Sequence, residues 1–195
     1  VHAPKETKYT ADMIGSVYEQ SLDSSTRRHG GVHYTPYEVA KRLARIALSE
    51  LPFGPICDPS VGGGAFLLAA AEYLSEKGVS PKKIIGEYLW GIDLDQGAIE
   101  VAKASISIWG STKVWIPVDE HFAVANSLQS GMRSFLAPPK KGFIAVIGNP
   151  PFQNQLQETT VRPIEETQKL REKWNVNAGP YADTASYFLL VALSM

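Results

Sequence analysis

The positions of apolar residues predict helices and strands that alternate along most of the chain. Apolar side chains recur at helical spacing in residues 11–22 and 65–77, a helix can begin at Ser80-Pro81, and Asp95 can cap another over residues 97–109. Short apolar runs bounded by turn residues are typical of buried strands, and they occupy residues 55–57, 89–93, 121–125 and 143–147. This alternation indicates an α/β fold, in which helices cover both faces of a parallel sheet.

The sequence TPYE predicts the start of a helix that runs to about Leu51. Thr35 would be its N-cap, Pro36 its first residue and Glu38 its third, as in a capping box. The face that we expect to point inward carries Val39, Leu43, Ile46 and Ala47. The outward face carries Lys41, Arg42 and Arg45.

Composition narrows the class of protein without naming a function. The chain has 195 residues, 44% of them hydrophobic, which favours one domain with an ordinary core. Its net charge of −1 gives no global electrostatic argument for a nucleic-acid partner. The single cysteine, Cys57, excludes an internal disulfide and suggests a reducing compartment, so we expect a cytoplasmic protein. No run is apolar enough to predict a membrane span, and no motif predicts a metal site.

Both ends of the sequence favour a fragment of a longer protein. The chain begins at Val1 rather than at a methionine, and it ends at Met195 inside an apolar segment that reads as an unfinished helix. If the sheet continues beyond Met195, the predicted strand at 143–147 should have an unpaired neighbour position in this chain.

The unusual residues gather in loops that follow the predicted strands. Because parallel strands end at the same edge of a sheet, and ligands bind outside those ends, we expect these loops to form one site. They are DPSVGGG (58–64), GIDLD (91–95), ANSLQ (125–129) and GNPPF (148–152).

The glycine-rich loop leaves room for a ligand to approach the backbone. Gly62, Gly63 and Gly64 precede a helix N-terminus, which favours a negatively charged group. The loop is neither the dinucleotide pattern nor a P-loop, and Asp58 would repel a pyrophosphate. An acid beside a glycine turn suits a ligand that carries both an ammonium and a carboxylate. A tight strand-to-helix turn with Asp58 as a cap is an equally good interpretation of this loop alone.

Two further loops carry candidate contacts to a nucleoside. Asp93 ends the second strand, where an acid commonly binds ribose hydroxyls, and Leu94 could pack on a purine. Asp95 is better placed than Asp93 to cap the next helix. Asn126 could bind a base edge, although by itself it would be taken for a turn residue.

The sequence GNPPF predicts a stiff loop that is rich in hydrogen-bond acceptors. Pro150 and Pro151 end the preceding strand and remove two backbone donors, while both carbonyls remain beside the Asn149 amide.

Together, these loops resemble S-adenosylmethionine-dependent amino-methyltransferases, in particular the gamma-type DNA adenine-N6 methyltransferases of restriction-modification systems. DPSVGGGAF is similar to the first motif, which more often reads DPACGSGAF, so Ser60, Val61 and Gly63 depart from it. HYTPYE resembles the Y-T-P element, and FIAVIGNPPF resembles the catalytic motif with its strand. The resemblance covers about residues 12–195, including a long link from Gln153 to Pro180 and a helix within YADTASYFLL.

This resemblance implies a Rossmann-like methyltransferase fold, truncated before its last strands. It implies an N-terminal helical segment at residues 1–34 and a catalytic core at 35–195. The implied cofactor is S-adenosyl-L-methionine. Its methionine end would lie at Thr35, Asp58 and Gly62, its ribose at Asp93, and its adenine at Asn126 and the Ser127 backbone. The other positions that the resemblance places at the cofactor are Tyr34, Ser60, Gly64, Phe66 and Leu94.

The resemblance also implies a target base and partners. Asn149, Pro150 and Phe152 would hold an adenine rotated out of double-stranded DNA, with Phe152 stacked on the base. A specificity or endonuclease subunit, or a domain outside this chain, would be a further partner. The neutral net charge favours a solvated surface over phosphate contacts for the basic residues Arg27, Arg28, Arg45, Lys140 and Lys141.

Other functions fit the same residues. The motif N-P-P-[YF] also occurs in methyltransferases that modify a glutamine amide in peptide release factors, and in some that modify guanine N2 in ribosomal RNA. The Y-T-P element favours the DNA class. A module that only binds DNA or cofactor is a third hypothesis, against which the intact Asn149 argues. NPPF as a structural turn, and Phe152 as a core residue, are the simpler interpretations.

Overall fold

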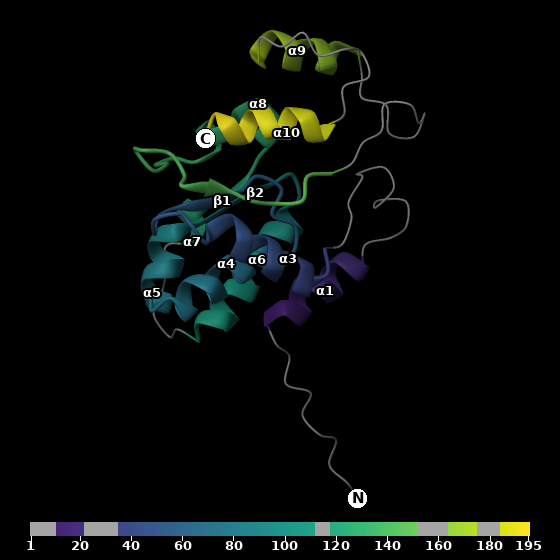
Figure 1. The fold of residues 1–195 in the computed structure, drawn as a ribbon. Helices are drawn as coiled ribbons and strands as arrows, with labels where there is room; N and C mark the ends of the chain where they lie inside the picture. Colours follow the sequence, from purple (N-terminus) through teal and green to yellow (C-terminus); the bar gives the residue numbers. More distant parts are fainter. Residues whose placement is uncertain (1–10, 22–34, 112–117, 152–163, 175–183) are drawn as a thin grey trace, which may run out of the picture.

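The computed structural model describes residues 11–21, 35–111, 118–151, 164–174 and 184–195. They form a parallel sheet of four strands with helices on both faces, which confirms the predicted Rossmann-like α/β class (Figure 1). The strand order is β3-β2-β1-β4. The strands are β1 (Ile56–Asp58), β2 (Leu89–Asp93), β3 (Phe122–Val124) and β4 (Ala145–Val146).

Most of the helices before β4 lie on one face of the sheet. They are α3 (Tyr37–Leu48), α4 (Ala65–Glu76), α5 (Pro81–Lys83), the π-helix η1 (Ile84–Tyr88) and α6 (Gln96–Gly110), with α1 (Ala11–Ser21) against α6. The other face is covered by α8 (Ser127–Ser130), α10 (Thr184–Leu193) and α9 (Ile164–Trp174). Two further short elements lie in the connections between strands: α7 (Val118–His121) and the 3₁₀ helix η2 (Gly131–Ser134). In the part of the chain that the structure describes, every helix is too short or too polar to span a lipid bilayer.

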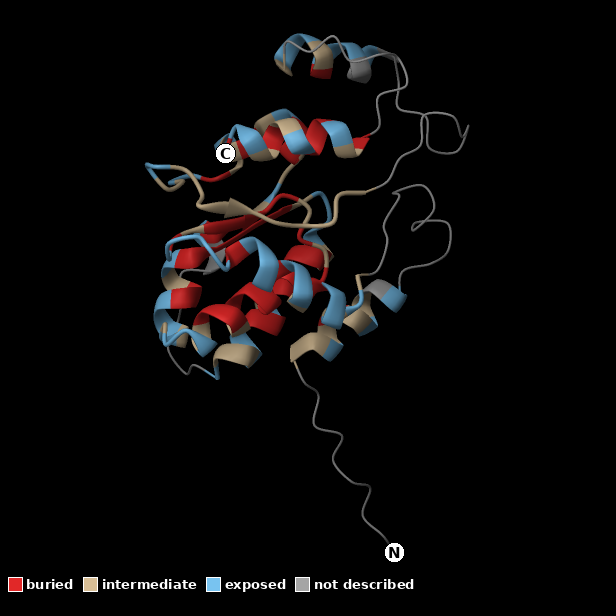
Figure 2. Cartoon of the chain, in the orientation of Figure 1, coloured by how far each residue is buried: buried red, intermediate tan, exposed pale blue. Residues whose placement is uncertain are grey.

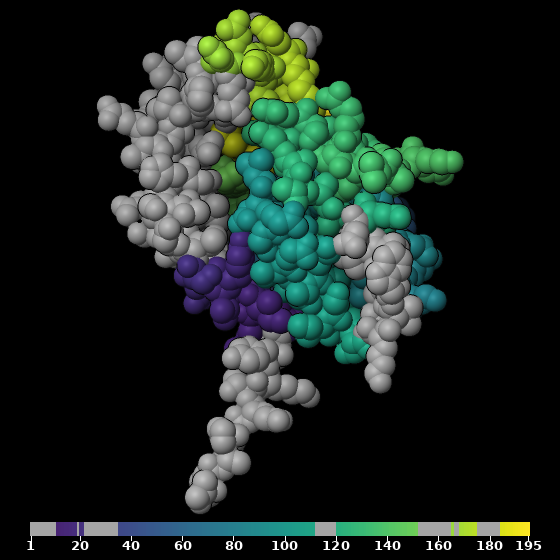
Figure 3. Space-filling model, turned by 180° about the vertical axis from the view of Figure 1, so that it is seen from behind, coloured from purple at the N-terminus to yellow at the C-terminus, as the bar shows by residue number. Residues whose placement is uncertain are grey.

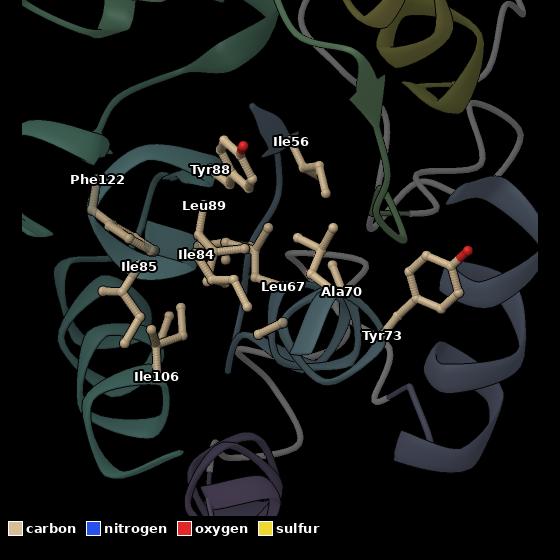
Figure 4. Close-up of a cluster of buried hydrophobic side chains, with 14 of the residues drawn as sticks. Ile56, Leu67, Ala70, Tyr73, Ile84, Ile85, Tyr88, Leu89, Ile106 and Phe122 are labelled. Carbon is tan, nitrogen blue, oxygen red and sulfur yellow. The ribbon is translucent and has the colours of Figure 1, made fainter. Parts of the chain in front are cut away.

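Successive strand residues pack into different cores because their side chains alternate between the two faces. Ile56 belongs to the cluster under α4 and α6, and Cys57 to the cluster under α8 and α10. Figure 4 shows the first cluster, in which Ile56 and Leu89 from the strands meet Leu67 from α4. Burial raises the pKa of the Cys57 thiol, as expected for a packing residue.

The prediction for the start of α3 is wrong in its details. The helix begins at Tyr37, its N-cap is Pro36 in an extended conformation, and no side chain caps it. Thr35 lies one residue before the N-cap, and its hydroxyl accepts a hydrogen bond from Asn149. Glu38 pairs with Lys41 at 3.7 Å rather than closing a capping box.

The predicted inward face of α3 is also wrong. Ala40, Ala44 and Leu48 are buried, whereas Val39, Leu43 and Ile46 are 45%, 48% and 71% exposed. Ala47 is exposed as well, and much of α3 is pale blue in Figure 2. The face with the alanines is the one that is buried, because small side chains let the α3 backbone approach Ala69 and Phe66 of α4 closely.

The remaining predicted elements agree with the structure, apart from one helix. The expected helices after Ser80 and Asp95 begin at Pro81 and Gln96, and these two polar residues are the N-caps. Helix α9 lies within the segment that we expected to be a long link, so that expectation is wrong there. Within the described residues β1 is the one strand that pairs with β4, and the Phe143 N–H, at the start of the expected strand, donates to the Met195 carbonyl at 3.1 Å. A continuation of the sheet stays a prediction. The division at residue 34 stays a prediction.

Candidate functional site

The loops that follow the strands meet along one edge of the sheet. The Val61 N–H donates to the Ile92 carbonyl at 2.9 Å, and the Ala125 N–H donates to the Asp93 carbonyl at 2.8 Å. On the other side of β1, the Ile147 N–H donates to the Cys57 carbonyl at 2.9 Å. These bonds extend the parallel pairing beyond the strand ends and bring the loops together, as the sequence predicts.

The glycine-rich loop has the backbone geometry that its sequence predicts. Gly62 and Gly64 have φ values of 50° and 87°, which favour glycine. A Cβ on Gly64 would lie 3.2 Å from Ala102 of α6, so this glycine also lets α4 and α6 pack closely. Asp58 is 1% exposed, and its Oδ1 accepts the Ser60 N–H at 2.9 Å, which shapes the turn.

Asp93 joins the glycine-rich loop to the loop after β2. Its Oδ2 accepts the Gly62 N–H at 2.9 Å and its Oδ1 accepts the Asp95 N–H at 3.0 Å. Burial raises the pKa of the carboxyl group, and the backbone donors only partly oppose this effect. The Leu94 N–H also favours the ionised carboxylate, so backbone donors use much of its acceptor capacity and part of that capacity remains for ribose hydroxyls. Asp95 is the N-cap of α6, as predicted.

The GNPPF loop lies directly beside Asp58. A Cβ on Gly148 would overlap Oδ1 of Asp58 and would lie 3.0 Å from its Cγ. The next residue, Asn149, donates from Nδ2 to Oγ1 of Thr35 at 3.1 Å. The structure therefore brings Thr35, Asp58 and Asn149 together, from positions far apart in the sequence.

The loop after β3 supplies a capped turn and a buried serine. Asn126 is the N-cap of α8, and its Oδ1 accepts the Leu128 N–H at 3.1 Å. This bond uses the side-chain oxygen locally and leaves the amide nitrogen as the group that could meet a base edge. Ser127 is 4% exposed, and Leu94 on the neighbouring loop is 71% exposed. An exposed leucine at this edge has the access that packing on a purine requires.

The predicted cofactor residues Ser60 and Phe66 lie in different surroundings, one polar and one packed among apolar side chains. The Ser60 hydroxyl is buried and has no hydrogen-bond partner among the described residues. Such an orphaned group beside a glycine turn fits a polar ligand. Phe66 packs with Ala40, Ala44 and Ala69, so its contact with a cofactor stays a prediction. The predictions for Tyr34 and Phe152 lie outside the described residues.

Sequence reasoning missed the role of Gly148. A glycine just before Asn149 is a signal for close backbone approach, and the approaching group is the Asp58 carboxylate. The contact between Gly15 of α1 and Gly63 was also missed. The sequence did contain a signal for this contact, namely a glycine in the middle of a short helix. Because glycine destabilises a helix, its presence there suggests that another segment packs closely against it.

Comparison with known proteins identifies the family. Residues 9–195 match the model of the family described as N-6 DNA Methylase, and the chain belongs to this family. It is 33% identical to the Type II methyltransferase M.VspI of Vibrio sp. (strain 343) over 96 residues, 48% of this chain and 21% of that protein. It is 28% identical to the Type II methyltransferase M.MamI of Microbacterium ammoniaphilum over 158 residues, 73% of this chain and 40% of that protein.

A solved structure supports the fold alone. The cryo-EM structure of a DrdV–DNA complex resembles this chain with a TM-score of 0.63 and 18% identity, over 94% of this chain and 21% of that chain. The chain spans less than half the length of the two Type II methyltransferases that it matches.

Proposed function

We propose that the protein containing this chain transfers a methyl group from S-adenosylmethionine to the N6 amino group of adenine in double-stranded DNA. It would be the modification component of a restriction-modification system. One observation carries the proposal: Thr35 holds the Asn149 amide, and the residue before Asn149, Gly148, lies against Asp58 at the start of the glycine-rich loop. Membership of the N-6 DNA Methylase family and the two Type II methyltransferase relatives support it.

The residues at the sheet edge fit the proposed cofactor. The Ser60 hydroxyl, the Asp58 carboxylate and the positive-φ glycine turn would hold an amino acid end that carries both charges. Asp93, which ends β2, would accept the ribose hydroxyls. Leu94, with Asn126 and the Ser127 backbone, would border the purine. When bound, the cofactor supplies an activated methyl group on sulfur.

The role of Asn149 follows from the chemistry of an aromatic amine. The lone pair of adenine N6 is conjugated into the ring, so the amino group is a poor nucleophile. Oδ1 of Asn149 and the Pro150 carbonyl would accept its two hydrogens and draw the lone pair out of conjugation. As the methyl group passes from sulfur to N6, positive charge would develop on the nitrogen. Acceptors already in place would stabilise that charge until one N6 proton is lost to solvent. No strong base is required for this step.

The proposed substrate sets the remaining requirements. The amino group is out of reach in stacked DNA, so the adenine would have to rotate into the site, with Phe152 as the proposed stacking partner. The DNA sequence would be read by residues or subunits outside this chain. As a DNA-modifying enzyme, the protein would act in the bacterial cytoplasm.

A methyl-transfer assay with the full-length protein tests this proposal. Labelled methyl should pass from S-adenosylmethionine to adenine in duplex DNA. Asn149→Ala should abolish transfer and leave cofactor binding nearly intact. Gln168→Ala is a matched control, because that amide is exposed on α9 and donates to Glu172 of the same helix. Label in a release-factor protein or in ribosomal RNA would move the assignment to one of the other amino-methyltransferase classes, which the DNA methylase family does not favour.

A further inference from the structure

We infer that α1 is a positioning element of the cofactor site, which holds the loops after β1 and β2 at a fixed separation. The inference rests on the proposed function, because that function assigns both loops to the cofactor. Helix α1 lies against α6 and α4, and in Figure 3 it is the purple surface that abuts the teal part of the molecule. Two independent contacts attach it to the loops.

The first contact is between two glycines. A Cβ on Gly15 would lie 2.5 Å from the Gly63 carbonyl oxygen, and a Cβ on Gly63 would lie 2.6 Å from the Gly15 Cα. Both glycines are buried, and the atoms that they meet belong to the backbone, which cannot rotate away. The backbone of α1 therefore rests directly on the glycine-rich loop. This contact explains why residue 63 is glycine, at a position where the similar motif more often has serine: a side chain there would collide with the α1 backbone.

The second contact is a hydrogen-bond network that begins at Tyr18. The Tyr18 hydroxyl donates to Oδ2 of Asp95, whose Oδ1 accepts the Gly97 N–H at 2.8 Å. The Asp95 N–H in turn donates to Asp93, and Asp93 accepts the Gly62 N–H. One network thus runs from α1 through the proposed ribose carboxylate to the glycine-rich loop. A Cβ on Gly97 would lie 2.7 Å from the Tyr18 hydroxyl, so glycine at this position leaves room for the bond to Asp95.

Helix α1 also forms one wall of a hollow at the site. Asp12, Gly15 and Ser16 line this hollow together with Gly63 and Thr35. Thr35 is the residue that binds Asn149, so the hollow adjoins both the proposed cofactor loops and the proposed catalytic amide. Covering the core requires only apolar contacts, whereas α1 also contacts these loops through the Gly15 backbone and the Tyr18 hydroxyl.

The hydroxyl of Tyr18 provides the sharpest test. Tyr18→Phe keeps the ring and removes the hydroxyl that donates to Asp95. In the full-length protein it should raise the dissociation constant for S-adenosylmethionine, measured calorimetrically, by about fivefold or more, as for energetically coupled groups. Hydrogen exchange at the Gly62 and Gly97 amides should also become faster in the ligand-free protein. Tyr73→Phe on α4 is the matched control and should change neither quantity.

Two more variants separate positioning from packing. In the background of Asp95→Asn, Tyr18→Phe should have little further effect, because both residues act through one bond. Gly15→Ala should weaken cofactor binding, whereas Gly86→Ala, whose Cβ would meet nothing within 4 Å, should not. Unchanged binding and exchange in Tyr18→Phe, or a lower melting temperature alone, would overturn the inference. If the unmodified protein binds no S-adenosylmethionine, the proposed function fails and this inference fails with it.

Discussion

The side-chain amide of Asn149 donates a hydrogen bond to the hydroxyl of Thr35, which lies 114 positions earlier in the chain. Because an amide group is planar, fixing Nδ2 on Thr35 also fixes the direction of Oδ1. A residue that precedes the first strand therefore orients the proposed catalytic acceptor. This relationship links the Y-T-P element to the N-P-P-F loop through one bond.

Removing this bond should slow methyl transfer more than it weakens binding. Thr35→Val keeps the shape of the side chain but cannot accept from Asn149. We expect kcat to fall about tenfold to a hundredfold, because a misplaced catalytic group costs rate in this range. The measurement is steady-state transfer to duplex DNA with separate titration of cofactor. Thr35→Ser restores the hydroxyl and should recover most of the rate. A valine variant as fast as the unmodified protein would contradict the orienting role.

Gly148→Ala should disturb the cofactor and the target base together. The added Cβ overlaps Oδ1 of Asp58, so either the carboxylate or the N-P-P-F loop must move. We expect weaker cofactor binding, lost transfer and a destabilisation of about 1–3 kcal/mol, as for overpacking elsewhere. Calorimetric binding and urea unfolding measure these effects, with Gly86→Ala as the control. Normal cofactor affinity in Gly148→Ala would show that the close approach is not needed.

Cofactor binding should weaken in mild acid because of Asp93. Burial raises the pKa of this carboxyl group above its usual range, so it takes up a proton at a higher pH than an exposed aspartate. The ionised form is the better acceptor for ribose hydroxyls, and affinity should therefore fall as the pH is lowered through the raised pKa. Binding titrations between pH 8 and pH 4.5 would show this fall. Asp93→Asn should bind more weakly at neutral pH and lose the dependence.

The order of the elements could be predicted from the sequence, whereas the close contacts of the site could not. The strand at 89–93 and the caps Ser80 and Asp95 depend on local patterns, which a sequence displays directly. The contacts of Gly148 with Asp58 and of Gly15 with Gly63 join distant segments. A glycine in the sequence indicates that another group approaches the backbone closely, but it does not identify that group.

Helix α3 shows the same limit for packing. Its largest apolar side chains suggested one face, but close approach to α4 selects the face with Ala40 and Ala44. Ala44→Leu should therefore destabilise the chain by about 1–3 kcal/mol through overpacking. Ile46→Ser, at a position 71% exposed, should change its stability by less than about 0.5 kcal/mol. Urea unfolding of this chain distinguishes the two faces, and the reverse ranking would mean that α3 is rotated about its axis.

The stability of the fold should fall in mild acid because of His121. This residue is buried and stacks on Trp90, with ring centroids 3.7 Å apart, and burial lowers the pKa of its imidazole. The unfolded chain takes up the proton first, near pH 6.5, so the stabilisation is present above that pH and is lost as the pH falls toward the lowered pKa. The urea midpoint should accordingly drop between pH 7.5 and pH 5.5. His121→Phe keeps a ring against Trp90 and cannot be protonated, so its midpoint should drop less over the same interval. An equal drop in both proteins would assign the acid sensitivity to other groups.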